Sequence, residues 1–312
     1  MNNRIFVWVL LLLLPISMSC GSTAMNMVAN ALSSTTSGTV FTGDDDPELV
    51  GDALPFALKL YESLLDEVKD NPELYLSTGS AFIMYANAYV QTPADMLPDE
   101  EYEKKSIMTE RARKLYIRGR DYVISGIEIE HPGFAAALYG ATLNDFLKEM
   151  EKEDVPYLYW CGAGWMAAYA TDPFNVDLGI GVKKAAAMME TGLRLDESYN
   201  DGAIHEFFVL YYGSLPQSMG GSEEKARYHF QRAVEIARGR TASPYVSLAS
   251  TVSVNNQDAE EYTALLTKAL AVDVSQRSGV RLVNIIAQRK ARWLLDHRED
   301  RILSDIKKGV KQ

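Results

Sequence analysis

The stretch LYYGSLPQSMGGSEEKARYHFQRAVEIA, from Leu210 to Ala237, contains two amphipathic segments of helical period separated by a short break. The break holds Pro216 and the Gly220-Gly221 pair, which interrupt helices. The second segment opens on Ser222, whose side-chain oxygen can accept a free backbone N–H at a helix N-terminus. Two glutamates follow, where the helix dipole favours negative charge. The stretch therefore predicts a helical hairpin with the break as its turn.

The same helical period continues over most of the chain. Apolar residues recur at helical spacing in segments such as VPYLYWCGAGWMAAYA, VKKAAAMMETGLRL and VRLVNIIAQRKARWLLDH. No stretch shows the sustained alternation, bounded by hairpin signals, that is typical of strands. Asp46, followed by Pro47, predicts the start of the first long helix, because proline at the first helical position loses no hydrogen bond. We expect an all-α protein, with one helical domain over residues 44–312.

A repeat of small and large residues runs through these helices. Ala226, Phe230 and Ala233 follow the small-x3-large-x2-small rule of the second helix of a tetratricopeptide (TPR) unit. The other copies are Ala112, Tyr116 and Gly119; Ala185, Met189 and Gly192; and, degenerate, Ala57, Tyr61 and Leu64, and Tyr262, Leu266 and Ala269. Their spacing is uneven, whereas TPR units repeat about every 34 residues. We expect TPR-like hairpins stacked in a compact superhelix, with insertions at residues 92–104 and 134–150.

The N-terminus has the features of an export signal. Arg4 precedes an apolar run over residues 5–14 that is too short to span a bilayer, and small residues follow it. Cys20, after Ser19, resembles the lipidated cysteine of a bacterial lipobox, although Ser17 stands where that motif usually has leucine. We therefore expect a signal peptide over residues 1–19, then a lipidated Cys20 and a tether to residue 43. Ordinary signal cleavage is the alternative.

Net charge and cysteine content limit the classes of partner and the bonds that the protein can form. The formal net charge of −11 is unfavourable for nucleic-acid binding, because phosphates require a basic surface. Only Cys20 and Cys161 are present, so lipidation of Cys20 would leave Cys161 without a disulfide partner. We expect Cys161 to pack as a small apolar residue. The predicted location is the periplasm, with a lipid anchor in a bacterial membrane.

The sequence offers no catalytic constellation. The four histidines lie far apart, and His205-Glu206 lacks the second histidine of HExxH. The glycines of GIG at 179–181 follow no predicted strand and lack the third glycine of a dinucleotide loop, and Ser222 is already assigned as a cap. We expect no enzyme activity, no metal and no cofactor. The enzymatic alternative is a hydrolase that depends on His205 or Glu206.

The aromatic segment YLYWCGAGWMAAYA, residues 157–170, is apolar on nearly all sides. It is typical of a central core helix. Alternatively, some of its rings line a groove for an apolar ligand or a partner helix, as concave helical-repeat surfaces do. The same two interpretations apply to Tyr211 and Tyr212, which precede the hairpin turn.

Several segments, in order, resemble one known family. They are FTGDDDPELVGDALPFALKLYESLL, ARKLYIRGRDY, LYW, GAIHEFFVLYYGSLP with GGSEEKARYHFQRAVEIA, and LVNIIAQRKARWLLD. Between about Asn26 and Leu303 the chain is similar to the T components of tripartite ATP-independent (TRAP) transporters, which are TPR-like periplasmic lipoproteins. The resemblance implies association with the periplasmic solute-binding protein of such a transporter and homotrimers in some members. It also implies a pore or cleft for an elongated, hydrophobic ligand.

We therefore expect a lipid-anchored accessory subunit of a TRAP transporter. It would dock the solute-binding protein and bind or pass an elongated hydrophobic ligand. The alternative is a general TPR scaffold that assembles proteins of the bacterial envelope. The residues expected at the ligand or partner cleft are Tyr116, Arg118, Tyr159, Trp160, Trp165, His205, Glu206, Tyr211 and Tyr212.

Overall fold

The computed structural model describes residues 40–276 and 278–303. The predicted signal peptide, Cys20 and nearly all of the tether lie outside these residues. Every regular element within them is helical, which confirms the all-α fold. The elements of the first half are α4 (Pro47–Glu67), α5 (Pro72–Tyr85), the π-helical η1 (Ala86–Gln91), α6 (Thr92–Asp95), η2 (Asp99–Glu101), α7 (Tyr102–Glu130), α8 (Phe134–Tyr139), α9 (Leu143–Phe146), η3 (Leu147–Glu149), η4 (Lys152–Asp154) and α10 (Val155–Thr171). Those of the second half are α11 (Val176–Leu195), α12 (Tyr199–Ser214), η5 (Gln217–Met219), α13 (Glu223–Ile236), α14 (Ser243–Leu248), the π-helical η6 (Ala249–Ser253), α15 (Ala259–Leu270), η7 (Ser278–Val280), α16 (Arg281–Asp296) and η8 (Arg298–Asp300).

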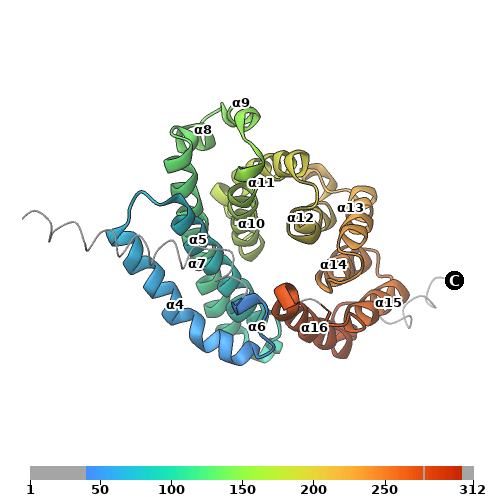
Figure 1. Ribbon diagram of the computed structural model, residues 1–312. Helices are drawn as coiled ribbons and strands as arrows, with labels where there is room; N and C mark the ends of the chain where they lie inside the picture. Colours follow the sequence, from blue (N-terminus) through green and yellow to red (C-terminus); the bar gives the residue numbers. More distant parts are fainter. Residues whose placement is uncertain (1–39, 277, 304–312) are drawn as a thin grey trace, which may run out of the picture.

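The helices follow one another around a ring (Figure 1). Neighbours along the chain pack against each other: α5 with α7, α7 with α10, α10 with α11, α12 with α13, and α15 with α16. From α10 onward, α10, α12, α14 and α16 lie nearer the middle of the ring, and α11, α13 and α15 lie further out (Figure 1). The short helices α8 and α9 fall in the predicted insertion over residues 134–150 and project at one edge.

Polar caps fix the helix starts, as the sequence predicts. The side chain of Asp46 accepts the backbone N–H of Leu49 at 3.0 Å, and Pro47 opens α4. Asn71, Asn175 and Asp258 cap α5, α11 and α15 in the same way. These bonds satisfy donors that a helix leaves without an internal partner.

The break inside the quoted stretch is a hairpin turn. Gly220 adopts φ +104°, a left-handed conformation that favours glycine. Gly221 lies so close to Leu215 that a Cβ there would come within 1.8 Å of the Leu215 carbonyl oxygen. The backbone N–H of Ser222 donates to the carbonyl of Tyr212 at 2.9 Å, which ties the start of α13 to the end of α12. The α12–α13 hairpin is confirmed.

The small positions of the repeat lie in helix contacts. Ala112, Ala185 and Ala226 are fully buried. The closest approach is between α5 and α7, where a Cβ on Gly119 would lie 2.7 Å from the carbonyl oxygen of Gly79. Side chains larger than hydrogen would hold these two backbones apart. The assignment of the hairpins to TPR units stays a prediction.

The last long helix returns to the first. α16 packs against α4, and Arg289 forms a two-point ion pair with Glu48 at 2.5 and 3.0 Å. Leu282 of α16 is buried in the apolar cluster built by α4, α5, α7, α10, α11 and α12. A second cluster, from α12 to α16, completes the core. The ring is therefore closed mainly by apolar burial, because exposed ion pairs contribute little.

Replacing Ser222 with alanine should lower the free energy of unfolding by about 1 kcal/mol, because the N-cap acceptor of α13 is lost. Ser125→Ala is the matched control, since the Ser125 hydroxyl is exposed and bonds only to a carbonyl within its own helix. Chemical denaturation of both variants measures the effect. Equal stabilities would contradict the capping role.

Candidate functional site

The structure places Tyr159 and Trp160 of α10 beside Tyr199 at the start of α12, and Glu206 lies further along the same helix. All four side chains are partly exposed. The rings of Tyr159 and Trp160 meet edge to face with centroids 5.1 Å apart, and the Tyr199 ring lies 5.3 Å from Tyr159. We call these four residues, together with Ser243 of α14, the inner site. It includes three of the nine residues predicted for the cleft.

Glu206 is the carboxyl group of the inner site. Its two carboxylate oxygens accept hydrogen bonds from the hydroxyls of Ser243, at 2.7 Å, and Ser247, at 3.1 Å. Burial raises the pKa of Glu206 although the side chain is partly exposed, and the two serine bonds oppose this. A carboxylate on a convex surface would be well hydrated. The raised pKa therefore reflects the burial of Glu206 between α12 and α14.

His205 faces the other way, into the α12–α13 contact, and is only 1% exposed. Its Nε2 lies 3.2 Å from Glu197 Oε1, and its Nδ1 lies 2.8 Å from His229 Nδ1. Because a carboxylate only accepts, Nε2 of His205 carries the proton and its Nδ1 accepts one from His229. Burial lowers the pKa of both histidines, to about 4 for His229, where the charge of His205 adds to the effect. Both rings therefore serve as packed, neutral hydrogen-bonding groups near pH 7.

Tyr211 and Tyr212 lie along the same hairpin. Tyr211 is buried and stacks on Phe207 with ring centroids 6.0 Å apart. Tyr212 is partly exposed and stacks on His229, with the Lys225 ammonium 5.0 Å from its ring centroid. Tyr211 therefore belongs to the first apolar cluster, and Tyr212 belongs to the packing between α12 and α13.

Two further predicted residues lie in the core. Tyr116 is fully buried, and its hydroxyl donates to Gln91 Oε1 at 2.5 Å. Trp165 donates its indole N–H to the Leu178 carbonyl at 3.1 Å and fills the space left by Gly181, where a Cβ would lie 1.8 Å from the indole. Neither side chain is available to a ligand without repacking of the core, so neither joins the inner site.

Arg118 lies in a surface pocket between α4, α5 and α7, outside the inner site. It pairs with Glu62 and stacks over the Phe82 ring, 4.9 Å from its centroid. Glu62 also accepts from Tyr122 at 2.6 Å and pairs with Lys59 at 2.5 Å. Glu62 is thus bonded to Lys59, Arg118 and Tyr122, which suits a structural link between α4 and α7.

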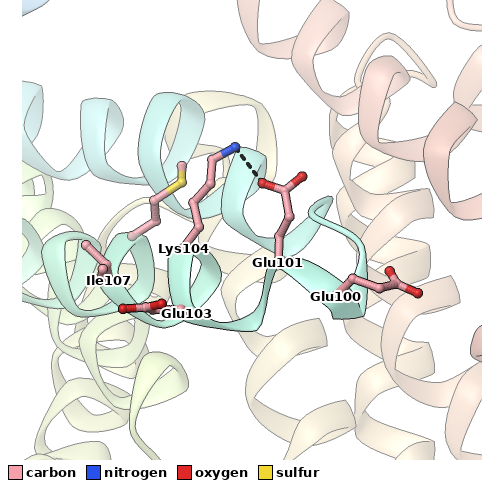
Figure 2. Close-up of a pocket in the computed structure, with 6 residues that line it drawn as sticks. Glu100, Glu101, Glu103, Lys104 and Ile107 are labelled. Atoms are coloured by element: carbon pink, nitrogen blue, oxygen red, sulfur yellow. Dashed lines mark hydrogen bonds and ion pairs between the residues drawn. The ribbon is translucent and has the colours of Figure 1, made fainter.

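A shallow pocket also lies at the N-terminal end of α7 (Figure 2). It is lined by Ile107, Met108 and the charged residues before them, and Lys104 pairs with Glu101 at 2.8 Å. Glu100 and Glu103 are exposed and form no pair with the other residues drawn in Figure 2. No groups converge there on a common point.

The described residues contain no group of three or more His, Cys, Asp and Glu side chains arranged to hold a metal ion. Cys161 is fully buried, and burial raises the pKa of its thiol to about 12. A thiol with this pKa is a poor nucleophile, which fits its predicted packing role. Within residues 40–276 and 278–303, no helix has the length and apolar character needed to span a bilayer.

Sequence reasoning identified Tyr159, Trp160 and Glu206, but it missed Tyr199 and the two serines on α14. The spacing of Ser243 and Ser247, four residues apart, places them on one helix face, but nothing in the sequence pairs that face with Glu206. The sequence reasoning also treated His205 and His229 as distant residues, because their contact forms only when α12 and α13 pack together.

The fold and the inner site define an all-helical array protein in which aromatic rings of α10 meet the start of α12 and a carboxyl group links α12 to α14. A family model described as the TRAP transporter T-component matches residues 43–301. An uncharacterized protein of Treponema pallidum (strain Nichols) is 35% identical over 264 residues, which cover 84% of this chain and 82% of that protein. The chain belongs to the TRAP transporter T-component family.

Proposed function

We propose that the protein is a lipid-anchored periplasmic subunit of a TRAP transporter that docks the solute-binding protein and receives an elongated, hydrophobic ligand. Membership of the T-component family supports the transport role. The acidic composition, with a net charge of −11, is unfavourable for nucleic-acid binding and consistent with protein and small-molecule partners. Lipidation of Cys20 would hold the helical ring beside a bacterial membrane.

The observation that carries docking is an exposed apolar patch where α10 turns into α11. Phe174 is 95% exposed, and Val176 and Ile180, one helical turn apart on α11, are exposed beside it in the chain. Exposed apolar side chains that gather in one place are typical of protein interaction surfaces. We propose that Phe174, Val176 and Ile180, the α11 patch, contact the solute-binding protein.

The double variant Phe174→Ser/Ile180→Ser should weaken recovery of the solute-binding protein from native membranes by at least tenfold. Each apolar side chain buried at an interface contributes about 1.5–3 kcal/mol, and 1.4 kcal/mol corresponds to a factor of ten. Phe56→Ser is the matched control, because Phe56 is an exposed aromatic residue on α4. The measurement is affinity capture from detergent-solubilised membranes, followed by mass spectrometry.

Capture of outer-membrane or secretion components in place of a solute-binding protein would favour the general envelope scaffold and contradict docking. If the double variant and the parent capture equal amounts of the solute-binding protein, the α11 patch is not part of the interface. The homotrimer that the family resemblance implies is a separate proposal. Light scattering of the purified mature chain tests it, and a monomer at micromolar concentration would contradict it.

A further inference from the structure

The first long helix, α4, carries an apolar stripe on its outward side. Leu49 is 59% exposed, Phe56 75% and Leu60 40%, and Ala53 is exposed between them. These residues follow one another at spacings of four, three and four, so they lie on one side of the helix. The opposite side of α4 is buried and packs against α5. We call Leu49, Ala53, Phe56 and Leu60 the α4 stripe.

The chain enters α4 through a tight turn. Residues 40–42 are helical, and residues 43–46 separate them from Pro47, the first residue of α4. The backbone N–H of Asp44 donates to the carbonyl of Phe41 at 3.3 Å, and the Phe41 side chain packs against the first apolar cluster. Short connections between helices join antiparallel neighbours. The turn therefore favours a path back along α4 for the chain that precedes it.

The sequence before this turn supplies apolar residues at matching spacing. Between residues 20 and 43 the apolar stretch is MNMVANAL, at residues 25–32, and its neighbours are Gly, Ser, Thr and Ala. Met25, Val28 and Leu32 are three and four positions apart, so a helix would place them on one side. No residue from 20 to 43 is charged. The stretch can therefore be buried without desolvating a charge.

The position of the turn relates this stretch to the α4 stripe. On two antiparallel helical arms, residues equally far from Asp44 along the chain lie level with each other, because both arms rise equally per residue. Leu32 is then level with Phe56, and Val28 with Leu60. A contact within one chain also has an effective concentration of about millimolar for a short linker. This favours the chain's own segment over a second copy.

The charges of α4 are unfavourable for a membrane as the occupant of the stripe. Helices that lie on anionic bilayers carry Lys and Arg on their polar side. In α4 the basic residue is Lys59. The acidic residues of the helix are Glu48, Asp52, Glu62, Asp66 and Glu67.

We propose that residues 25–32 lie along α4 as an antiparallel helix, with Met25, Val28 and Leu32 facing the α4 stripe. This inference goes beyond the docking of a solute-binding protein and does not depend on it. A helix this short is marginal in water, so its contact with α4 stabilises it. If Cys20 carries a lipid, residues 21–24 alone separate that lipid from the docked helix. The membrane anchor then holds the ring with α4 next to the bilayer.

Hydrogen exchange of the mature chain, carrying Cys20→Ser, measures the contact. In the parent, the amides of residues 26–32 should exchange at least tenfold more slowly than in the double variant Leu49→Ser/Phe56→Ser. The variant removes two side chains of the stripe, and both are exposed, so the helical ring should remain folded. Thermal unfolding checks this.

The matched control is Val176→Ser/Ile180→Ser, which removes two exposed apolar side chains from the α11 patch. It should leave the exchange of residues 26–32 at the parent rate. Equal exchange of these residues in the parent and in the α4 double variant would overturn the proposal.

Engineered disulfides test the register of the contact. A disulfide requires Cβ atoms about 4 Å apart. With Cys20→Ser present, Val28→Cys/Leu60→Cys should form an intramolecular disulfide in oxidised glutathione, whereas Val28→Cys/Ile180→Cys should not. Cys161 is fully buried and does not compete.

The same variants distinguish the other occupants. A disulfide between two chains would assign the α4 stripe to a second copy and overturn the proposal, as would the absence of any disulfide in Val28→Cys/Leu60→Cys. Equal disulfide yields in both cysteine pairs would show that the segment has no fixed place on α4. Binding to phosphatidylglycerol vesicles that is lost in Leu49→Ser/Phe56→Ser would assign the stripe to a membrane instead.

Discussion

The variant Gly119→Ala is expected to unfold with a free energy about 2 kcal/mol below that of the parent, because the new methyl group overpacks the α5–α7 contact. Its Cβ would lie 2.7 Å from the Gly79 carbonyl oxygen and 2.8 Å from Ile83 Cγ1. The backbone oxygen cannot rotate away as a flexible side chain would, so the two helices must separate. A gain of about 1 kcal/mol in helix propensity opposes the effect but does not cancel it.

Gly179→Ala is the matched control for this prediction. At Gly179, in the first turns of α11, a Cβ would meet only Tyr169 Cε2 at 3.7 Å, which is an ordinary contact. The control should therefore be stabilised by about 0.5–1 kcal/mol through the unfolded state. Urea denaturation of both variants measures the difference. A stabilised Gly119→Ala would show that α5 and α7 are packed more loosely than the structure indicates.

Acidification should destabilise the protein through the buried pair of His205 and His229. The folded state holds the pKa of His229 at about 4, and burial lowers that of His205, whereas an unfolded histidine takes up a proton near pH 6.5. The unfolded state therefore binds more protons between these values. This contribution to stability is fully present above pH 6.5 and is lost as the pH falls toward 4. For His229 the full loss is about 3 kcal/mol.

The measurement is the free energy of unfolding between pH 6.5 and 5, before most carboxylates titrate. In this window Glu206 acts in the opposite direction, because its raised pKa favours the folded state as the pH falls. His229→Asn should reduce the pH dependence, since the asparagine amide can donate to His205 Nδ1 without titrating. His297→Asn, at an exposed position, is the matched control and should follow the parent. If the free energy of unfolding of His229→Asn changes with pH as steeply as that of the parent, the histidine pair does not cause the pH dependence.

The local chemistry of the chain was predictable from sequence. Ser222 and Asp46 cap the helices assigned to them, and the Pro216 to Gly221 break is the hairpin turn expected there. These features depend on residues within a few positions of one another, so they need no contacts with distant helices. The inner site was predicted only in part. Tyr159, Trp160 and Glu206 lie in it, whereas Tyr116 and Trp165 lie in the core and Arg118 lies in a surface pocket.

Helical periodicity shows that a face is apolar, but it does not show which partner covers that face. Tyr116 and Trp160 are both aromatic residues on apolar helix faces, and only the packing of α7 and α10 buries the first and leaves the second partly exposed. The closure of the ring is a second case, since Glu48 and Arg289 meet only through the accumulated rotation of successive hairpins. The sequence by itself therefore determined the helices, their caps and the family. The tertiary structure decided which faces meet. The hydrophobic effect is non-directional, so an apolar helix face can be buried by any helix that the connections bring beside it.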